Sequence, residues 1–161
     1  MDGYQAVEVV GVRVEMPSNA PIVLVRPLTG GSLLPIWIGP NEAAAIAMAQ
    51  QGVAAPRPLT HDLFVAALLA LGTPLRSVRI TRLEEGVFYA ELIFDASAVD
   101  ARPSDAIALA LRAQVPILLA DEVLAEAGVA PEPDPDPADA QADEVQQFRE
   151  FLDHITPQDF E

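Results

Sequence analysis

The sequence predicts an α+β protein, in which a mixed or antiparallel sheet packs with Ala-rich helices in a single compact domain, followed by a C-terminal amphipathic helix. Three observations predict this class. Apolar segments of strand length come in pairs around short glycine-containing turns, as in antiparallel hairpins. Alanine-rich segments of helical length lie between these pairs. A stretch in which proline alternates with acidic residues then separates the compact part from the C-terminal end.

The strands are predicted from their alternation and their turns. Paired glycines in TGGS allow positive φ and join two apolar segments as a hairpin. Pro35 indicates an edge position for the second of these, because proline cannot donate to a sheet. In a later hairpin around the turn at residues 84–86, alternate residues from Phe88 to Phe94 share one face. The predicted strands are residues 5–14, 21–27, 33–38, 75–83, 87–94 and 115–120.

The helices are predicted at residues 39–52, 60–72, 103–112 and 121–128. Asn41 is the expected cap of the first, and Pro103 is a favoured first helical residue for the third. The three longer helices are apolar nearly all round, so we expect each to be buried on more than one side. A body of this size cannot easily bury three such helices alone. We therefore expect a homo-oligomer, with a dimer favoured.

The predicted organisation is a domain over residues 1–127, an acidic proline-rich linker over 128–143 and an amphipathic helix and tail over 144–161. Apolar residues recur at helical spacing in the last segment, which needs a surface such as a protein partner to dock on. The chain has no cysteine, no signal peptide and no apolar helical stretch long enough to cross a membrane. These features predict a cytoplasmic protein without a membrane partner.

The charge is unevenly distributed. The formal net charge is −15, with nine arginines and no lysine. Counting charged side chains gives −6 for residues 1–127 and −9 for the rest. A broad nucleic-acid-binding surface is normally basic, so this balance argues against one. The body is nevertheless able to present a local pocket lined by arginine.

One phrase occurs twice, as RPLTHD at residues 57–62 and RPSD at residues 102–105. The structural interpretation is that both mark helix starts. The residue before proline favours extended conformations, and Thr60 and Ser104 suit N-cap or first-turn positions. Asp62 and Asp105 then favour the positive helix ends, and the two arginines pair with them.

The functional interpretation is that these helix starts converge on one site. Arginines 57 and 102 match the geometry of phosphate, and helix N-termini attract anions. Carboxylates suit a divalent cation such as Mg²⁺ or Mn²⁺, and His61 suits a general base. Glu42 begins the first helix in a similar setting. The predicted catalytic residues are Glu42, His61, Asp62 and Asp105, the predicted metal ligands are Glu42, Asp62 and Asp105, and the predicted substrate-binding residues are Arg57, Arg102 and Ser104.

Two other residues favour ordinary roles. Trp37 in LLPIWIG is expected in the core or an interface rather than as a platform for a nucleic-acid base. His154, near the end of the C-terminal segment, is expected to be a solvated cap.

The motifs LPIWIGPNEAAAIA, PRPLTHDL, FYAELIF, DARPSDAIALALR and VPILLADEVL, in this order, resemble the bifunctional nuclease domain family over residues 5–127. The closing FREFLDHITPQDF is similar to the tail of bacterial members. The resemblance implies a compact α+β domain that self-associates, and cleavage of DNA and RNA, for which a longer plant member is named. The positions that match the family's polar residues are Glu42, Arg57, His61, Asp62, Arg102, Ser104 and Asp105.

Two functions follow as hypotheses. The first is a metal-dependent nuclease that acts on short or single-stranded DNA or RNA, because the acidic body suits long duplexes poorly. The second is a non-catalytic regulatory or scaffold module with structural Arg–Asp pairs. Open, unpaired carboxylates favour the first, and buried mutual pairing favours the second. A third interpretation is a pocket that senses a small phosphorylated ligand.

Overall fold

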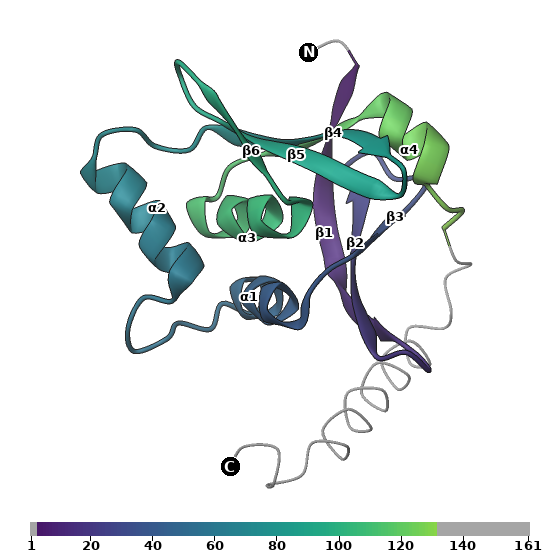
Figure 1. Ribbon diagram of the computed structural model, residues 1–161, viewed down its shortest axis with the longest axis horizontal. Coiled ribbons are helices and arrows are strands. Elements are labelled where there is room, and N and C mark those ends of the chain that lie inside the picture. Colours follow the sequence, from purple (N-terminus) through teal and green to yellow (C-terminus); the bar gives the residue numbers. More distant parts are fainter. Residues whose placement is uncertain (1–2, 132–161) are drawn as a thin grey trace, which may run out of the picture. The chain divides into compact units, whose positions relative to one another are not determined.

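The computed structural model describes residues 3–131 and shows a seven-stranded mixed sheet with four helices (Figure 1). The strands are β1 (Tyr4–Glu15), β2 (Ala20–Pro27), β3 (Leu34–Trp37), β4 (Ser77–Glu84), β5 (Val87–Ile93), β6 (Ala98–Ala101) and β7 (Ile117–Ala120). The helices are α1 (Pro40–Gln51), α2 (Thr60–Ala70), α3 (Pro103–Ala113) and α4 (Asp121–Ala127). The predicted α+β class is confirmed. The predicted C-terminal helix and most of the predicted linker lie outside the described residues.

The sheet has the strand order β3-β2-β1-β7-β4-β5-β6. Every pairing is antiparallel except that of β4 with β7, which follows the crossover through α3. Both predicted hairpins are present, as β2–β3 and β4–β5. Pro35 lies in the edge strand β3, where a missing N–H donor costs no sheet hydrogen bond. The sequence prediction missed β6, a short and mostly exposed strand at the other edge.

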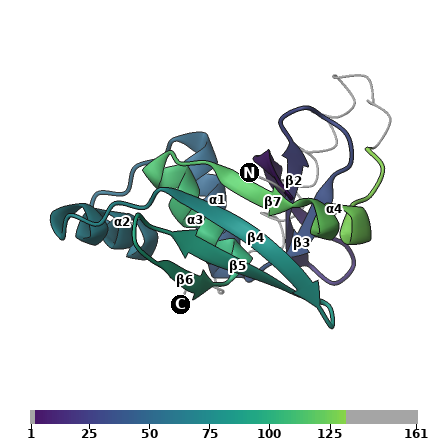
Figure 2. The same cartoon turned by 90° about the horizontal axis from the view of Figure 1, so that it is seen from above.

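Helix α3 lies at the centre of the helical layer. It contacts α1 and α2 on its sides and β4 and β5 above, and seven of its residues are buried. In the view from above, α1, α2 and α3 lie together, whereas α4 lies at the other end of the sheet (Figure 2). The core joins buried side chains of the sheet, such as Val78 and Ile80, to Ile107 of α3 and Ile46 of α1.

Two sequence predictions about the helices are wrong. Asn41 does not cap α1, because Pro40 takes the first helical position with its preset φ and Gly39 becomes the N-cap. Helix α2 is not buried on more than one side, since none of its residues is buried. It packs mainly on α3 and leaves large apolar side chains such as Leu63 exposed. Within the described residues, no helix is long and apolar enough to span a membrane.

Candidate functional site

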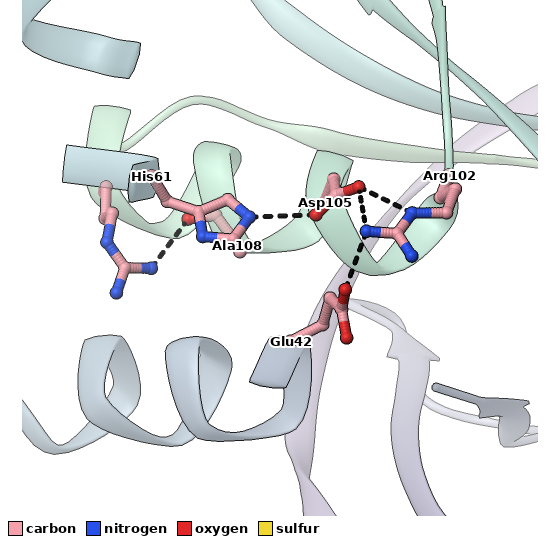
Figure 3. A network of polar contacts seen from close by, with 6 residues as sticks. Glu42, His61, Arg102, Asp105 and Ala108 are labelled. Atoms are coloured by element: carbon pink, nitrogen blue, oxygen red, sulfur yellow. Dashed lines mark hydrogen bonds and ion pairs between the residues drawn. The ribbon is translucent and has the colours of Figure 1, made fainter. Parts of the chain in front are cut away.

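The first turns of α1, α2 and α3, together with the residue before α3, bring four polar side chains together, and we call this group the polar cluster. Its members are Glu42, His61, Arg102 and Asp105, which point toward one another in Figure 3. Asp105 occupies the third position of α3, where its charge favours the positive end of the helix dipole. The predicted convergence of the three helix starts is therefore present in the fold.

Arg102 links α1 to α3. Its Nε donates to Asp105 Oδ2 at 2.7 Å, and its Nη2 donates to Glu42 Oε1 at 2.6 Å. The hydrogen bonds with Asp105 and Glu42 raise the pKa of Arg102 further above its ordinary value. The Arg102 side chain is still 65% exposed, so one face of the guanidinium remains open to solvent. Such a group can bind another anion on that face.

His61 links α2 to the carboxylate of Asp105. Its Nε2 lies 2.9 Å from Asp105 Oδ1, and both side chains are partly buried. Burial acts to raise the pKa of Asp105, but hydrogen bonds from Arg102 and His61 outweigh it and hold that pKa below the ordinary value. Asp105 is therefore an anion that orients a histidine on one oxygen and an arginine on the other.

Asp62 belongs to a separate ion pair. Its Oδ1 accepts from Nε of Arg112 at 2.7 Å, and its Oδ2 accepts from the backbone N–H of Leu59 at 3.2 Å. Asp62 thus caps the start of α2 and ties that helix to the end of α3. The sequence interpretation that Arg57 pairs with Asp62 is wrong, because Arg112 takes this place and Arg57 is exposed in the loop before α2.

The Asp62→Asn variant is expected to destabilise the protein by about 1–3 kcal/mol, because the Arg112 side chain is only 10% exposed and would lose its counter-charge. Thermal unfolding followed by circular dichroism measures this loss. Asp95→Asn is the matched control, since it removes the carboxylate of an exposed Arg–Asp pair and should leave the unfolding midpoint nearly unchanged. Equal midpoints for the two variants would contradict the structural role of Asp62.

Gly39 allows Glu42 to reach Arg102. A Cβ built on Gly39 would overlap the Glu42 Oε2 atom. Any larger residue there would displace the carboxylate from its position beside Arg102. Gly39 therefore helps to shape the polar cluster by leaving room for the Glu42 carboxylate. The sequence analysis did not predict this role.

Ser104, the third predicted substrate-binding residue, occupies the second position of α3 and is only 6% exposed. Its hydroxyl makes no hydrogen bond within the described residues. It lines a cavity on the side of Arg102 that faces β3 and β5. Arg102 therefore belongs to the polar cluster and also lines this cavity.

The carboxylates as they stand do not fit a bound divalent cation. Across residues 3–131, no three His, Asp or Glu side chains gather in a way that would hold a metal ion. Glu42 and Asp105 both bind the guanidinium of Arg102, and Asp62 binds that of Arg112. The assignment of Glu42, Asp62 and Asp105 to a Mg²⁺ or Mn²⁺ ion stays a prediction.

Of the residues that the sequence predicted, Glu42, His61, Arg102 and Asp105 form one network, and Asp62 lies in the neighbouring pair with Arg112. Arg57 joins neither group. Arg112 was missed, because a lone arginine at the end of an apolar helix is explained equally well by the helix dipole. Its only distinguishing signal is that it is the sole cation in a helix that is otherwise mostly buried.

Comparison with known proteins shows which family the chain belongs to. The chain is 54% identical, over 96% of both chains, to an uncharacterized protein of Mycobacterium tuberculosis. It is 32% identical to bifunctional nuclease 2 of Arabidopsis thaliana over 63% of this chain and 34% of the plant protein. Bifunctional nuclease 1 of Oryza sativa subsp. indica is 29% identical over 68% of this chain and 35% of its own length. The model of the bifunctional nuclease domain matches residues 22–132, from β2 to just beyond α4, and the chain therefore belongs to the bifunctional nuclease domain family.

Proposed function

We propose that this chain hydrolyses phosphodiester bonds in short or single-stranded DNA or RNA at the polar cluster. The observation that carries the proposal is the arrangement around Asp105, which holds His61 on one oxygen and a solvent-exposed arginine on the other. A general base beside a cation that is open to solvent is the minimum that attack on a phosphodiester requires. Membership of the family and the plant relatives named as bifunctional nucleases support the same reaction.

His61 is the proposed general base. Because an ionised carboxylate only accepts hydrogen bonds, the contact with Asp105 places the imidazole proton on Nε2. Nδ1 is then the basic nitrogen, which takes a proton from water or from the 2′-hydroxyl of RNA as that oxygen attacks phosphorus. Asp105 stabilises the imidazolium that forms, and the leaving oxygen receives the proton in turn.

Arg102 is the proposed phosphate-binding residue. Its contacts with Asp105 and Glu42 use Nε and Nη2, and within the described residues Nη1 makes no hydrogen bond. Nη1 is therefore available to a phosphate oxygen while the rest of the guanidinium stays fixed by two carboxylates. A fixed donor costs little reorganisation when charge develops on the phosphate in the transition state. Glu42 acts here as a positioning residue for Arg102.

The proposed substrates are short or single-stranded because the domain has no excess of positive charge. Long duplexes bind through many phosphate contacts, each of which needs a cation. The polar cluster offers a single exposed arginine, which suffices for one or two phosphates.

The test is cleavage of labelled single-stranded RNA and DNA by the wild type and by His61→Ala, each with Mg²⁺, Mn²⁺ or EDTA. We expect the rate to fall by about 10²- to 10⁴-fold in the variant, the usual contribution of a general base. His154→Ala is the matched control, because it removes the only other histidine of the sequence and is purified by the same procedure. Equal rates in all three preparations would identify a copurifying enzyme and reject the proposal. Loss of cleavage in EDTA would instead favour the predicted metal ligands.

A second candidate is the non-catalytic scaffold module. The observation that favours it is that Asp62 and Asp105 are both paired with arginine, as expected for structural pairs. The Arg112 side chain is only 10% exposed and fits this role, whereas the Arg102 side chain is 65% exposed. The scaffold alone predicts that His61→Ala changes no enzymatic rate.

A further inference from the structure

A cavity of about 390 Å³ is lined by Arg102 but not by His61. Its walls come from three parts of the chain that are distant in sequence: the end of β3 with the residues before α1, the start of β5 and the start of α3. Pockets for small ligands in proteins measure about 300–1,000 Å³. The space is therefore large enough for one flat ring system.

The walls of this cavity are apolar and aromatic. Trp37 and Ile38 lie on one side, and Val87 and Phe88 lie on the other. Trp37 is 58% exposed, so of the two places expected from the sequence, the core is wrong, whereas an interface stays a prediction. Its strand β3 is an edge strand, and alternation along it buries Ile36 and turns Trp37 outward. An exposed tryptophan on a rigid strand is a suitable surface for stacking.

The floor of the cavity carries polar groups with unused bonding capacity. Ser104 is more than nine-tenths buried and lines the cavity, and its hydroxyl makes no hydrogen bond within the described residues. Arg102, a member of the polar cluster, also lines the cavity. The first residues of α3 also belong here, and the free N–H groups of an 11-residue helix favour an anion at this end.

We infer that this cavity is a nucleotide subsite, in which a nucleobase stacks on Trp37 while Arg102 and the start of α3 hold the adjoining phosphate. The juxtaposition of an aromatic wall and a phosphate-binding rim selects a base joined to a phosphate rather than phosphate alone. In a single strand the base is free to enter, whereas in a duplex it is paired and stacked. The inference rests on the proposed nuclease function for its substrate class, and it adds the group that places the scissile phosphate beside His61.

Trp37 is the only tryptophan in the chain, so its fluorescence reports on the cavity directly. The experiment titrates the full chain carrying His61→Ala, which leaves the probe uncut, with hexanucleotides of adenine in ribo and deoxyribo forms. An abasic oligonucleotide with the same number of phosphates serves as the matched probe. We expect saturable quenching by the two base-containing probes and little quenching by the abasic one.

Variants then locate the contact, with binding measured by anisotropy of labelled probes. Trp37→Leu should weaken binding of the adenine probes by about 5- to 100-fold, the range for loss of one stacked base. Trp37→Phe should restore most of the affinity, because it keeps an aromatic face. Leu28→Ala removes an exposed apolar side chain outside the cavity and should bind as the unsubstituted chain does.

Equal quenching by abasic and adenine probes, together with unchanged binding by Trp37→Leu, would overturn the subsite. Quenching by inorganic phosphate alone to the same extent would overturn it as well. Base-dependent quenching without any cleavage by the wild type would leave the subsite standing and reject the nuclease. Cleavage without base-dependent quenching would support the nuclease and reject the subsite. Comparison of the ribo and deoxyribo probes shows whether the cavity takes a base from RNA or from DNA.

Discussion

The Asp105→Asn variant is expected to cleave single-stranded RNA or DNA about 10²- to 10⁴-fold more slowly than the wild type, the range for loss of general-base function. Asp105 accepts hydrogen bonds from His61 and Arg102 on separate oxygens. An asparagine that accepts from Arg102 through its oxygen must donate to His61 through its amide, which makes Nε2 the acceptor and moves the imidazole proton to Nδ1, the nitrogen that would act as the base. The neutral amide also removes the charge that stabilises the protonated histidine. Initial rates with a 5′-labelled oligonucleotide measure the effect.

The matched control is Asp95→Asn, which removes a carboxylate from the exposed pair with Arg76 and should cleave at the wild-type rate. A second readout tests the fold of the Asp105 variant. Because hydrogen bonds from Arg102 and His61 hold the pKa of Asp105 below its ordinary value, the wild type has this stabilisation above the ordinary pKa and loses it as the pH falls through the lowered pKa. The variant should lack this part of the acid dependence. A fully folded variant with undiminished cleavage would remove Asp105 from the mechanism.

Much of the fold follows from local patterns in the sequence. The Gly-Gly turn before β3 and the Gly86 turn between β4 and β5 sit between alternating apolar segments, and both hairpins form there. Strand β6 carries no such pattern, because a short edge strand buries little and needs no apolar face. The order in which distant strands pair, with β7 between β1 and β4, depends on tertiary packing that local periodicity does not encode.

The part of the candidate site that lies at helix starts could be predicted from the sequence. Asp62 and Asp105 both occupy the third helical position, which the repeated phrase indicates from sequence alone. Which arginine each aspartate binds is set by the packing of α2 on α3, so the assignment held for Arg102 and failed for Arg57. Alternation along β3 turns Trp37 outward, but which face of this edge strand is buried depends on tertiary packing.

The exposed face of α2 bears on both the site and the assembly. This helix carries His61 at its start, yet it has no buried residue, and Leu63 and Leu69 are 59% and 62% exposed. A helix of 11 residues is marginal in water without a packed face. From Leu63 to Leu75 the sequence has no charged residue. Two copies of a chain with a net charge of −15 repel each other, and they approach best where their surfaces are neutral.

We propose that a second copy of the chain covers α2, so that self-association fixes the helix that positions His61. Ala67→Glu is expected to raise the dissociation constant of the dimer by at least about 10²-fold, because it sets like charges against each other in the interface. Ala67 is exposed, and glutamate is a good helix former, so the monomer should stay folded. Ala44→Glu makes the same change at an exposed position of α1 and is the matched control.

Sedimentation velocity over a range of concentrations measures the association. A wild type that is monomeric throughout would reject self-association, and a dimer that persists in Ala67→Glu would place the interface on another face. The alternative is that the C-terminal segment covers α2. Truncation before residue 144 tests this alternative, because a dimer that forms through α2 itself should survive the truncation. If the dimer orders α2, the cleavage rate per chain should rise with concentration in the wild type and stay constant in Ala67→Glu. That coupling follows because α2, which carries His61, is held to the domain by the contact of His61 with Asp105, the ion pair of Asp62 with Arg112 and the packing of α2 on α3.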